Sequence, residues 1–310
     1  MLRERAGIIR SIRSFFESRN YLELDTPIMS PDLIPESCLE VFETTRISPS
    51  HSEESQKLWL APSPEIWMKK IIACHHVNVF QICKCFRNGE STGHLHNPEF
   101  TMLEYYTQNA DYTDSLLLTE GLLTCLASWL TAPFERLTMA QAFGRWAGFD
   151  LFEAASKKGA MMDEARRLGL DPPAETGVEV LYDLIFIHCV EPHLKSDKPV
   201  FLLDYPAFVP CLAKNNGKTT ERWELYYKGI ELANCFSEET DPEKVKQFFI
   251  NEAAVKEKSA LIRHKVNHDY RKIFEPPGAF PRCSGVALGV DRLIMALTGR
   301  SSIESVLTFT

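Results

Sequence analysis

The sequence predicts an α+β fold: a mostly antiparallel sheet flanked by helices. Strand-like segments at residues 77–87 and 100–106 are joined by a polar loop, and residues 224–233 are typical of a hairpin. Such short connections join antiparallel neighbours. A mostly helical block at residues 112–195 separates these segments. We therefore expect one domain over residues 1–310, with that block as a helical insertion.

Helical and strand periodicities place the other elements of the first hundred residues. In chain order they are a helix over residues 2–16, a short strand over 21–27, a loop over 30–56, a strand over 58–61 and a helix over 65–73. Pro27 suits a strand end or edge because it cannot donate to a ladder. Pro64 suits the first turn of the helix that follows it.

The elements after residue 110 follow from the same patterns. Asp111 or Thr113, and Thr138, are expected helix caps within the helical block, because such side chains accept hydrogen bonds from free backbone N–H groups. The block is followed by a strand over residues 199–205, the hairpin, a charged helix over 242–273, a strand over 284–288 and a helix over 291–297.

The composition counts against several classes of function. A net charge of −8, from 34 basic and 42 acidic residues, gives no general case for binding a polyanion such as tRNA, and no long Lys/Arg block is present. The longest apolar runs are far too short to cross a bilayer, so no membrane partner is expected. The amphipathic N-terminus is unlike a signal peptide, which predicts a cytoplasmic protein.

The nine cysteines predict neither disulfides nor a metal site. They form no CxxC pair, and the best metal candidate, Cys74-His75-His76, lacks a matching second half. We expect reduced thiols that serve as small core residues.

The two strands before the helical block carry the first candidate site. The second strand places on one face Phe100, Met102, Glu104 and Tyr106. If the first strand pairs with it, Arg87 lies near Phe100, and the loop between the strands folds over a bound molecule. An arginine beside an aromatic ring suits a nucleotide, because the guanidinium binds phosphate and the ring stacks on the base. A solvated strand face is the alternative at this point.

The hairpin over residues 224–233 carries the second candidate site. Glu224 and Glu231 are seven residues apart, which would put them on opposite faces of one straight strand. A two-residue turn at Lys228-Gly229 pairs Tyr226 with Glu231, so that both glutamates share a face. Adjacent carboxylates repel unless a cation lies between them, and Mg²⁺ carrying ATP phosphates meets that requirement. A pair of solvent-facing glutamates is the alternative.

The third candidate is the strand-to-helix turn over residues 285–292. Its spaced glycines are a weak signal on their own. Arg292 adds a fixed cation at the start of the helix, where the helix dipole already favours phosphate.

Taken in order, these segments resemble the three signature motifs of class II aminoacyl-tRNA synthetases. The matching residues are the first helix with the strand ending at Pro27, then Phe86-Arg87 with residues 96–104 (HNPEFTMLE), then Gly289-Val290-Asp291-Arg292. The second motif, residues 229–234 (GIELAN), Ser63-Pro64-Glu65 and Met68-Lys69 are similar to the lysyl-tRNA synthetase branch. The resemblance covers essentially the whole chain. It implies a class II catalytic core, with the helical block between the second and third motifs.

The resemblance implies an ATP site and a reaction. Arg87 and Arg292 are the implied catalytic cations on the α- and γ-phosphates, and Phe100 stacks on adenine. The other implied ATP contacts are Asn88, Glu90, Asn97, Glu231, Leu232 and Gly289, and the implied Mg²⁺ ligands are Glu224 and Glu231. ATP and Mg²⁺ are thus the implied cofactors. The amino acid's carboxylate attacks the α-phosphorus, giving an aminoacyl-adenylate and pyrophosphate.

The resemblance also implies a pocket for a lysine-like amino acid. Its implied residues are Ser63, Pro64 and Glu65 around the α-ammonium, Glu104, Tyr106 and Glu238 around the side-chain ammonium, and Asn234 and Ala287 beside them. Two buried carboxylates and a phenol suit a desolvated ammonium. Strand parity from Glu231 does not bring Glu238 to the same face, so a bend or bulge is required between them.

The implied acceptor is a protein. Lysyl-tRNA synthetases carry an N-terminal anticodon-binding barrel, whereas this chain begins at the first catalytic helix, so no anticodon-binding domain is expected. Ala287 stands where the synthetases usually have glycine and their protein-modifying relatives have alanine. These features are similar to the lysyl-tRNA synthetase-like ligases that transfer (R)-β-lysine, or less readily lysine, to a specific lysine of elongation factor P. That family implies elongation factor P as the partner, an amide bond as the product and a homodimer formed through the first motif.

Two alternatives and two departures accompany this interpretation. A truncated synthetase-like enzyme would charge tRNA or another small acceptor, and a regulatory paralogue would have lost the phosphate and metal ligands that this chain retains. Gly89 stands where the family has glutamate, and a one-residue shift of the loop gives that place to Glu90. Cys235 stands where the family has glycine, which is expected to narrow the pocket or alter a turn.

Overall fold

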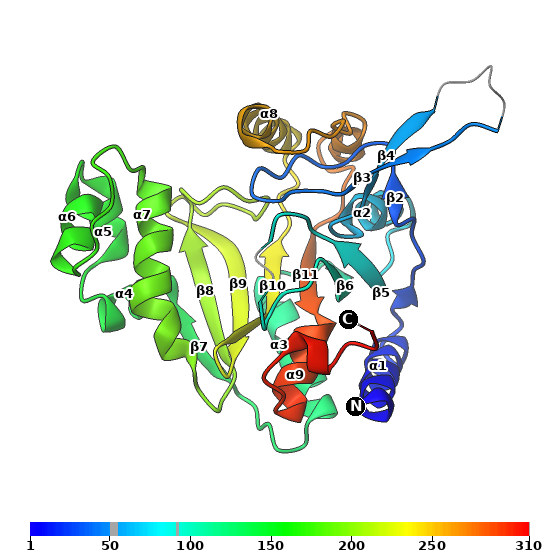
Figure 1. The fold of residues 1–310 in the computed structure, drawn as a ribbon, viewed down its shortest axis with the longest axis horizontal. Helices are drawn as coiled ribbons and strands as arrows, with labels where there is room; N and C mark the ends of the chain where they lie inside the picture. Colours follow the sequence, from blue (N-terminus) through cyan, green and yellow to red (C-terminus); the bar gives the residue numbers. More distant parts are fainter. Residues whose placement is uncertain (50–54, 91–92, 310) are drawn as a thin grey trace.

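Two sheets organise the chain. The computed structural model describes residues 1–49, 55–90 and 93–309. Within them a large sheet has eight strands in the order β1-β5-β6-β11-β10-β9-β8-β7, and a small sheet has the order β2-β4-β3 (Figure 1). Neighbours in the large sheet are antiparallel except for the edge pairs β1–β5 and β7–β8. The predicted α+β fold with a mostly antiparallel sheet is therefore confirmed.

The bounds of the elements are as follows. The large sheet contains β1 (Leu22–Glu23), β5 (Val79–Phe86), β6 (Glu99–Gln108), β7 (Glu135–Thr138), β8 (Val200–Pro206), β9 (Thr219–Tyr227), β10 (Ile230–Ser237) and β11 (Cys283–Gly289), and the small one β2 (Met29–Ser30), β3 (Glu43–Arg46) and β4 (Gln56–Leu60). The α-helices are α1 (Leu2–Glu17), α2 (Glu65–His75), α3 (Tyr112–Leu126), α4 (Met139–Trp146), α5 (Leu151–Ser156), α6 (Ala160–Arg167), α7 (Val178–Ile185), α8 (Pro242–Ser259) and α9 (Val290–Thr298). Shorter turns are η1 (Phe186–Val190), η2 (Glu191–Leu194), η3 (Tyr270–Phe274) and η4 (Ile303–Ser305). In the described part of the chain, no helix is long and apolar enough to cross a membrane.

One face of the large sheet packs against α1 and α3. Phe16 of α1 stacks on Phe80 of β5 with ring centroids 5.0 Å apart, and Tyr105 and Trp223 lie in the same buried cluster. Helix α3 contacts β9, β10 and β11 on this side. Since successive residues of a strand point to opposite faces, the residues next to these core residues in sequence point to the other side of the sheet.

The other elements cover the remaining surfaces of the sheet. Helices α2 and α8 and the turn η3 pack around Met68, Ile72, Phe249 and Phe274. Helices α4 to α7 lie beyond β8 at the left of Figure 1, and their buried side chains, such as Phe143, pack with those of β8.

Two predicted elements are shorter than expected. The helix predicted over residues 242–273 ends at Ser259, because Ala260 has an extended backbone and the next two N–H groups donate to the Glu40 carboxylate. The strand predicted over residues 21–27 is reduced to the two-residue β1.

Two regions predicted without strands contain short ones. The loop predicted over residues 30–56 includes β3, which pairs with β4, and residues 50–54 of it lie outside the described residues. The sequence of β3, ETTR, has no apolar alternation, so periodicity could not reveal it. The helical block over residues 112–195 includes β7, which pairs in parallel with β8. The caps predicted at Asp111 and Thr138 are confirmed, and each forms a capping box.

The first helix is tied to both later motifs by one buried ion pair. Arg5 of α1 donates to the Asp291 carboxylate at 2.6 Å and to the Thr101 hydroxyl at 2.9 Å. The backbone N–H of Thr101 donates to the other Asp291 oxygen at 2.6 Å. Helix α1, strand β6 and helix α9 are thus fixed relative to one another, and these elements carry or adjoin the two arginines.

Candidate functional site

Two rows of side chains cross the face of the large sheet opposite α1 and α3. From β6 to β9, the first row contains Glu104, Ala287, Asn234 and Glu224 in register. The neighbouring row contains Tyr106, Gly285, Phe236 and Arg222 in the same strand order. Each row places residues that lie far apart in the sequence side by side on one surface.

The hairpin has the predicted register. Tyr226 pairs with Glu231, and the turn residues Lys228 and Gly229 have φ values of 54° and 76°. Positive φ at both central residues defines the turn that matches the twist of paired strands, and glycine adopts it readily. Glu224 and Glu231 therefore share a face, as expected.

A bulge follows immediately on β10. The pairing with β9 shifts between Glu231 and Ala233, which leaves Leu232 as an extra residue. An extra residue in one strand reverses which side its later residues face. Asn234, and with it the chain leading to Glu238, therefore returns to the side of Glu231. The bend that the sequence required is confirmed.

A cavity lies between the loop after β5, the strands β6, β10 and β11, and the start of α9. The predicted residues that line it are Arg87, Glu90, Asn97, Phe100, Glu231, Leu232, Asn234, Ala287, Gly289 and Arg292. Both predicted catalytic arginines and the predicted adenine-stacking ring thus lie in one cavity.

Arg87 is held in place with part of its guanidinium unused. Its Cζ lies 5.2 Å from the centroid of the Phe100 ring, and its Nη1 lies 3.7 Å from the Glu90 carboxylate. Its Nε is buried and has no hydrogen-bond partner among the described residues. Arg87 lines the cavity, and its contact with the Glu90 carboxylate is longer than a hydrogen bond, so the guanidinium suits an anionic ligand such as a phosphate.

Arg292 lies at the first turn of α9. Its Nε donates to the Leu95 carbonyl at 3.2 Å, and its Nη1 donates to the Glu231 carbonyl at 3.2 Å and lies 3.4 Å from the Glu231 carboxylate. These contacts aim the guanidinium into the cavity from the helix N-terminus, where the backbone dipole already favours negative charge.

The two hairpin glutamates form an acidic pair with spare capacity for a cation. One Glu224 oxygen accepts from Arg222 at 2.6 Å and the other from the Tyr226 hydroxyl at 2.8 Å. A carboxylate has about four lone-pair sites, so each oxygen can still accept a further ligand. Desolvation beside the cavity, and then the charge of Glu224, raise the pKa of Glu231. Two carboxylates, with phosphate oxygens and water, are the ligand set that Mg²⁺ prefers at nucleotides.

The residues predicted to bind the amino acid form a buried acidic cluster that adjoins the cavity at Ala287. The Tyr106 hydroxyl donates to Glu104 at 2.6 Å, and Glu104, Tyr106 and Glu238 are each at most 6% exposed. Burial, and then the charge of Glu65, raise the pKa of Glu104 well above its ordinary value. Glu65 follows Pro64 at the start of α2 and accepts from the Tyr270 hydroxyl at 3.3 Å. An ammonium entering this pocket would relieve the repulsion among its carboxylates.

Comparison with known proteins identifies this architecture. Residues 1–310 match the family described as tRNA synthetases class II (D, K and N). The chain belongs to that family. Membership indicates an enzyme of the ligase type that activates an amino acid with ATP.

Several predicted residues do not line this cavity: Ser63, Pro64, Glu65, Asn88, Glu104, Tyr106, Glu224 and Glu238. Asn88 pairs with Glu40, and its side chain donates to the Val41 carbonyl and accepts from the Gly89 N–H. Ser63 and Pro64 lie beside Gln81 at a separate small depression next to α2.

The expectation that Cys235 narrows the pocket or alters a turn is wrong. Cys235 pairs with Val286 and Trp223 within the strands, and its side chain is 1% exposed in the core beneath α3. Its thiol lies 3.3 Å from the Ser284 hydroxyl. The bulge at Leu232 sets this orientation, because it turns residues 234 and 236 toward the site and residue 235 away from it.

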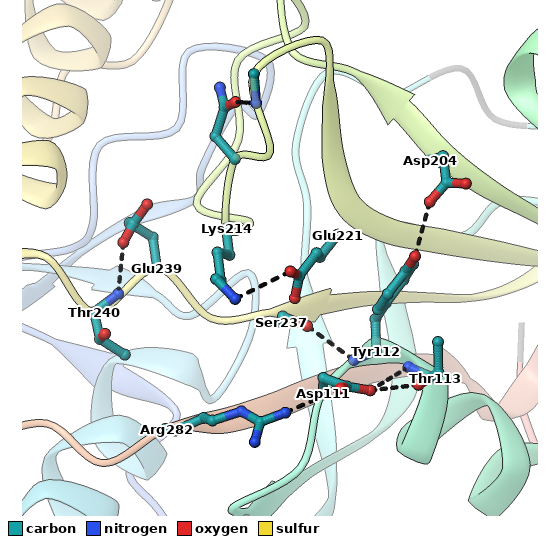
Figure 2. Close-up of polar contacts among 12 residues, drawn as sticks. Asp111, Tyr112, Thr113, Asp204, Lys214, Glu221, Ser237, Glu239, Thr240 and Arg282 are labelled. Atoms are coloured by element: carbon teal, nitrogen blue, oxygen red, sulfur yellow. Dashed lines mark hydrogen bonds and ion pairs between the residues drawn. The ribbon is translucent and has the colours of Figure 1, made fainter.

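Polar contacts anchor the end of β10 that carries Glu238. Figure 2 shows the Tyr112 N–H donating to the Ser237 hydroxyl at 2.8 Å, while the Tyr112 hydroxyl donates to Asp204 of β8 at 2.8 Å. The backbone of residue 238 pairs with Ala213 and donates to the Cys283 carbonyl. The pocket wall is therefore fixed from α3, β8 and β11 together.

Sequence reasoning assigned no role in the site to three residues that the structure places there, although Lys69 belongs to a segment that carries the resemblance. Lys69 forms buried ion pairs with Glu65 and Glu238, Arg222 holds Glu224, and Gly285 lets Tyr106 and Glu238 approach. Signals existed for two of them: Lys69 is four residues after Glu65 on a predicted helix, and Arg222 is two residues before Glu224 on a strand.

Proposed function

We propose that this synthetase activates (R)-β-lysine, or less readily lysine, as an adenylate and transfers it to a specific lysine of elongation factor P. The observation that carries the amino-acid class is the buried pocket of Glu104, Tyr106 and Glu238, which suits a desolvated ammonium. We place the reaction in the cytoplasm, and residues 1–310 in one catalytic domain.

The chain's own residues account for the positioning that activation requires. Arg87 follows β5 and Arg292 follows β11, both at the end of the sheet where β6 begins, and they would hold the α- and γ-phosphates of ATP. Phe100 offers its ring to adenine, and Glu224 and Glu231 would hold Mg²⁺, which neutralises phosphate charge when bound. In-line attack of the amino acid's carboxylate then needs alignment more than covalent help from the protein.

The residue that supports a protein acceptor is Ala287, on the strand beneath the site. Ala287 lies in register between Glu104 and Asn234 and lines the cavity. Its methyl group occupies the junction of the ATP site and the amino-acid pocket, where tRNA-charging relatives usually have glycine. The acceptor lysine attacks the adenylate as a free amine, so it must first lose a proton from a group with a pKa of about 10.4.

ATP–pyrophosphate exchange with (R)-β-lysine and with α-lysine tests the activation. We expect exchange with both and a higher kcat/KM for (R)-β-lysine. Incubation with elongation factor P should then add one lysyl or β-lysyl group, the mass of the amino acid less one water, at a single lysine of the factor. No exchange with either amino acid would refute the activation. Exchange followed by transfer to tRNA alone would move the acceptor to the alternative, a tRNA-charging enzyme.

We also propose a homodimer formed through the first motif. Four apolar side chains of the first 30 residues are exposed: Leu2 is 59%, Leu22 54%, Ile28 46% and Met29 52% exposed. Burying such a surface stabilises association. Light scattering should give twice the chain mass of 35.3 kDa. Met29→Lys should shift the protein to monomer, and Ile250→Lys on α8, an equally exposed position elsewhere, should not. A monomeric wild-type protein would contradict the proposal.

A further inference from the structure

Lys69 is a buried lysine inside the acidic pocket. It lies on α2 and is 2% exposed, although lysine is almost never fully buried unless it is paired. Its Nζ lies 2.7 Å from a Glu65 oxygen and 2.6 Å from a Glu238 oxygen. One ammonium therefore bridges two carboxylates that come from a helix and from the end of β10.

This bridge leaves the pocket with unused acceptors. Lys69 takes Oε2 of Glu238, and the other oxygen, Oε1, faces Gly285 on β11. Tyr106 donates to only one oxygen of Glu104. The centroid of the Tyr106 ring lies 5.7 Å from the Lys69 ammonium, so the ion-pair bridge and the predicted ammonium-binding groups lie next to one another.

The charges explain why a fixed cation is needed there. Three glutamates converge in a desolvated space, and like charges in low dielectric strongly disfavour one another. Burial opposes the charge of Lys69, but Glu238 and Glu65 outweigh it and raise the Lys69 pKa well above its ordinary value. Lys69 thus stays charged and balances one carboxylate, and the remaining carboxyl groups are left as acceptors for a ligand with ammonium groups.

We propose that Lys69 is a positioning residue: its ammonium holds Glu65 and Glu238 together as ionised carboxylates, and this bridge makes the pocket bind a diamino acid. The inference rests on the proposed amino-acid activation and extends it to a group that does not touch the substrate. The substrate's ammonium meets the oxygens that Lys69 leaves free.

The substitution Lys69→Met tests this role in ATP–pyrophosphate exchange. We expect KM for the amino acid to rise roughly 100-fold, because loss of one partner of a buried charge pair leaves the other uncompensated. KM for ATP should stay unchanged, since Arg87 and Phe100 lie in the neighbouring cavity. Lys69→Arg, which keeps the charge, should restore most of the affinity. A lower KM in Lys69→Met would instead show that the lysine blocks the pocket, and would overturn the proposal.

The pH profile separates positioning from a merely structural role. Burial raises the pKa of Glu238 to about 7, while Lys69 lowers it. Without Lys69 the Glu238 pKa rises further, so amino-acid binding by Lys69→Met should recover as the pH increases from about 7 to about 9. A loss of affinity that is independent of pH would refute the proposal. The other titratable groups that interact with Glu238 are Glu65 of α2, Tyr106 of β6, Cys235 of β10, Tyr270 of η3 and Cys283 of β11.

The adjacent Lys70 provides the matched control. Its Nζ lies 4.9 Å from the centroid of the Trp67 ring on the same helix, and Lys70→Met should change neither KM by more than about twofold. If Lys69→Met does not fold, as judged by thermal unfolding, Lys69→Gln replaces it and should show the same KM shift. If the wild-type protein catalyses exchange and the folded Lys69 variant has an unchanged KM for the amino acid, the role of Lys69 is refuted and the proposed function stands. If the wild-type protein catalyses no exchange, the proposed function is refuted.

Discussion

Arg87→Ala should lower kcat/KM for ATP–pyrophosphate exchange roughly 1,000-fold, a loss typical of removing one fixed donor to a developing charge. The guanidinium has a buried Nε without a partner in the described residues, and it stacks on Phe100 in the cavity. It therefore contributes little to the fold and is poised for a ligand. Thermal unfolding should shift little, and exchange measured at saturating ATP should show that the loss lies in kcat.

Arg145 is a control of the same geometry. Its Cζ also lies 5.2 Å from an aromatic centroid, that of Trp146, but on α4. Arg145→Ala should leave exchange unchanged. Arg87→Lys should remain at least about tenfold impaired, because an ammonium cannot reproduce the planar fork of a guanidinium. Exchange by Arg87→Ala within tenfold of wild type would contradict the assignment of the phosphate site.

Gly285→Ala should raise KM for the amino acid roughly 100-fold and leave KM for ATP unchanged. An added methyl at this position would lie 2.6 Å from the Glu238 carboxylate and closer still to the Tyr106 ring. Both groups are buried and cannot move aside without leaving the pocket. A shift of about an ångström in a buried polar pocket costs roughly two orders of magnitude in binding or rate.

A matched glycine tests whether the effect is local. Gly144 lies on α4, and apart from its chain neighbours and its own helix backbone no described atom lies within 4 Å of the added methyl. Gly144→Ala should therefore preserve both KM values and stabilise the helix slightly. If Gly285→Ala bound the amino acid normally, the close approach of Tyr106 and Glu238 would not be a requirement of the pocket.

The sequence predicts the faces of individual strands well, because alternation and turn chemistry are local. The register of the hairpin, the nearness of Arg87 to Phe100 and the need for a bulge before Glu238 all follow from spacing. Pairing between distant strands does not. No local pattern shows that Gly285 lies opposite Tyr106, so its role emerges only when β6 and β11 are placed side by side.

Cys235 illustrates the same limit from the other direction. Cys235 stands where the family has glycine, which suggested that residue 235 affects the pocket. Strand geometry turns the Cys235 side chain into the core instead.

The end of a helix can also depend on residues far away in the sequence. Helix α8 ends at Ser259 because the carboxylate of Glu40 accepts hydrogen bonds from the N–H groups that follow.

The single extra residue at Leu232 also allows two specificities to vary separately on one strand. Before it, β10 presents Glu231 to the nucleotide side, and after it the same strand presents Asn234 and leads to Glu238 on the amino-acid side. Deleting Leu232 would exchange the outward and inward sets of the second half, and would bring Cys235 to the surface in place of Asn234. Point changes after the bulge can therefore alter which amino acid is chosen without moving the half that holds ATP. Length changes there cannot be tolerated, so we expect this strand to accept substitution far more readily than insertion or deletion.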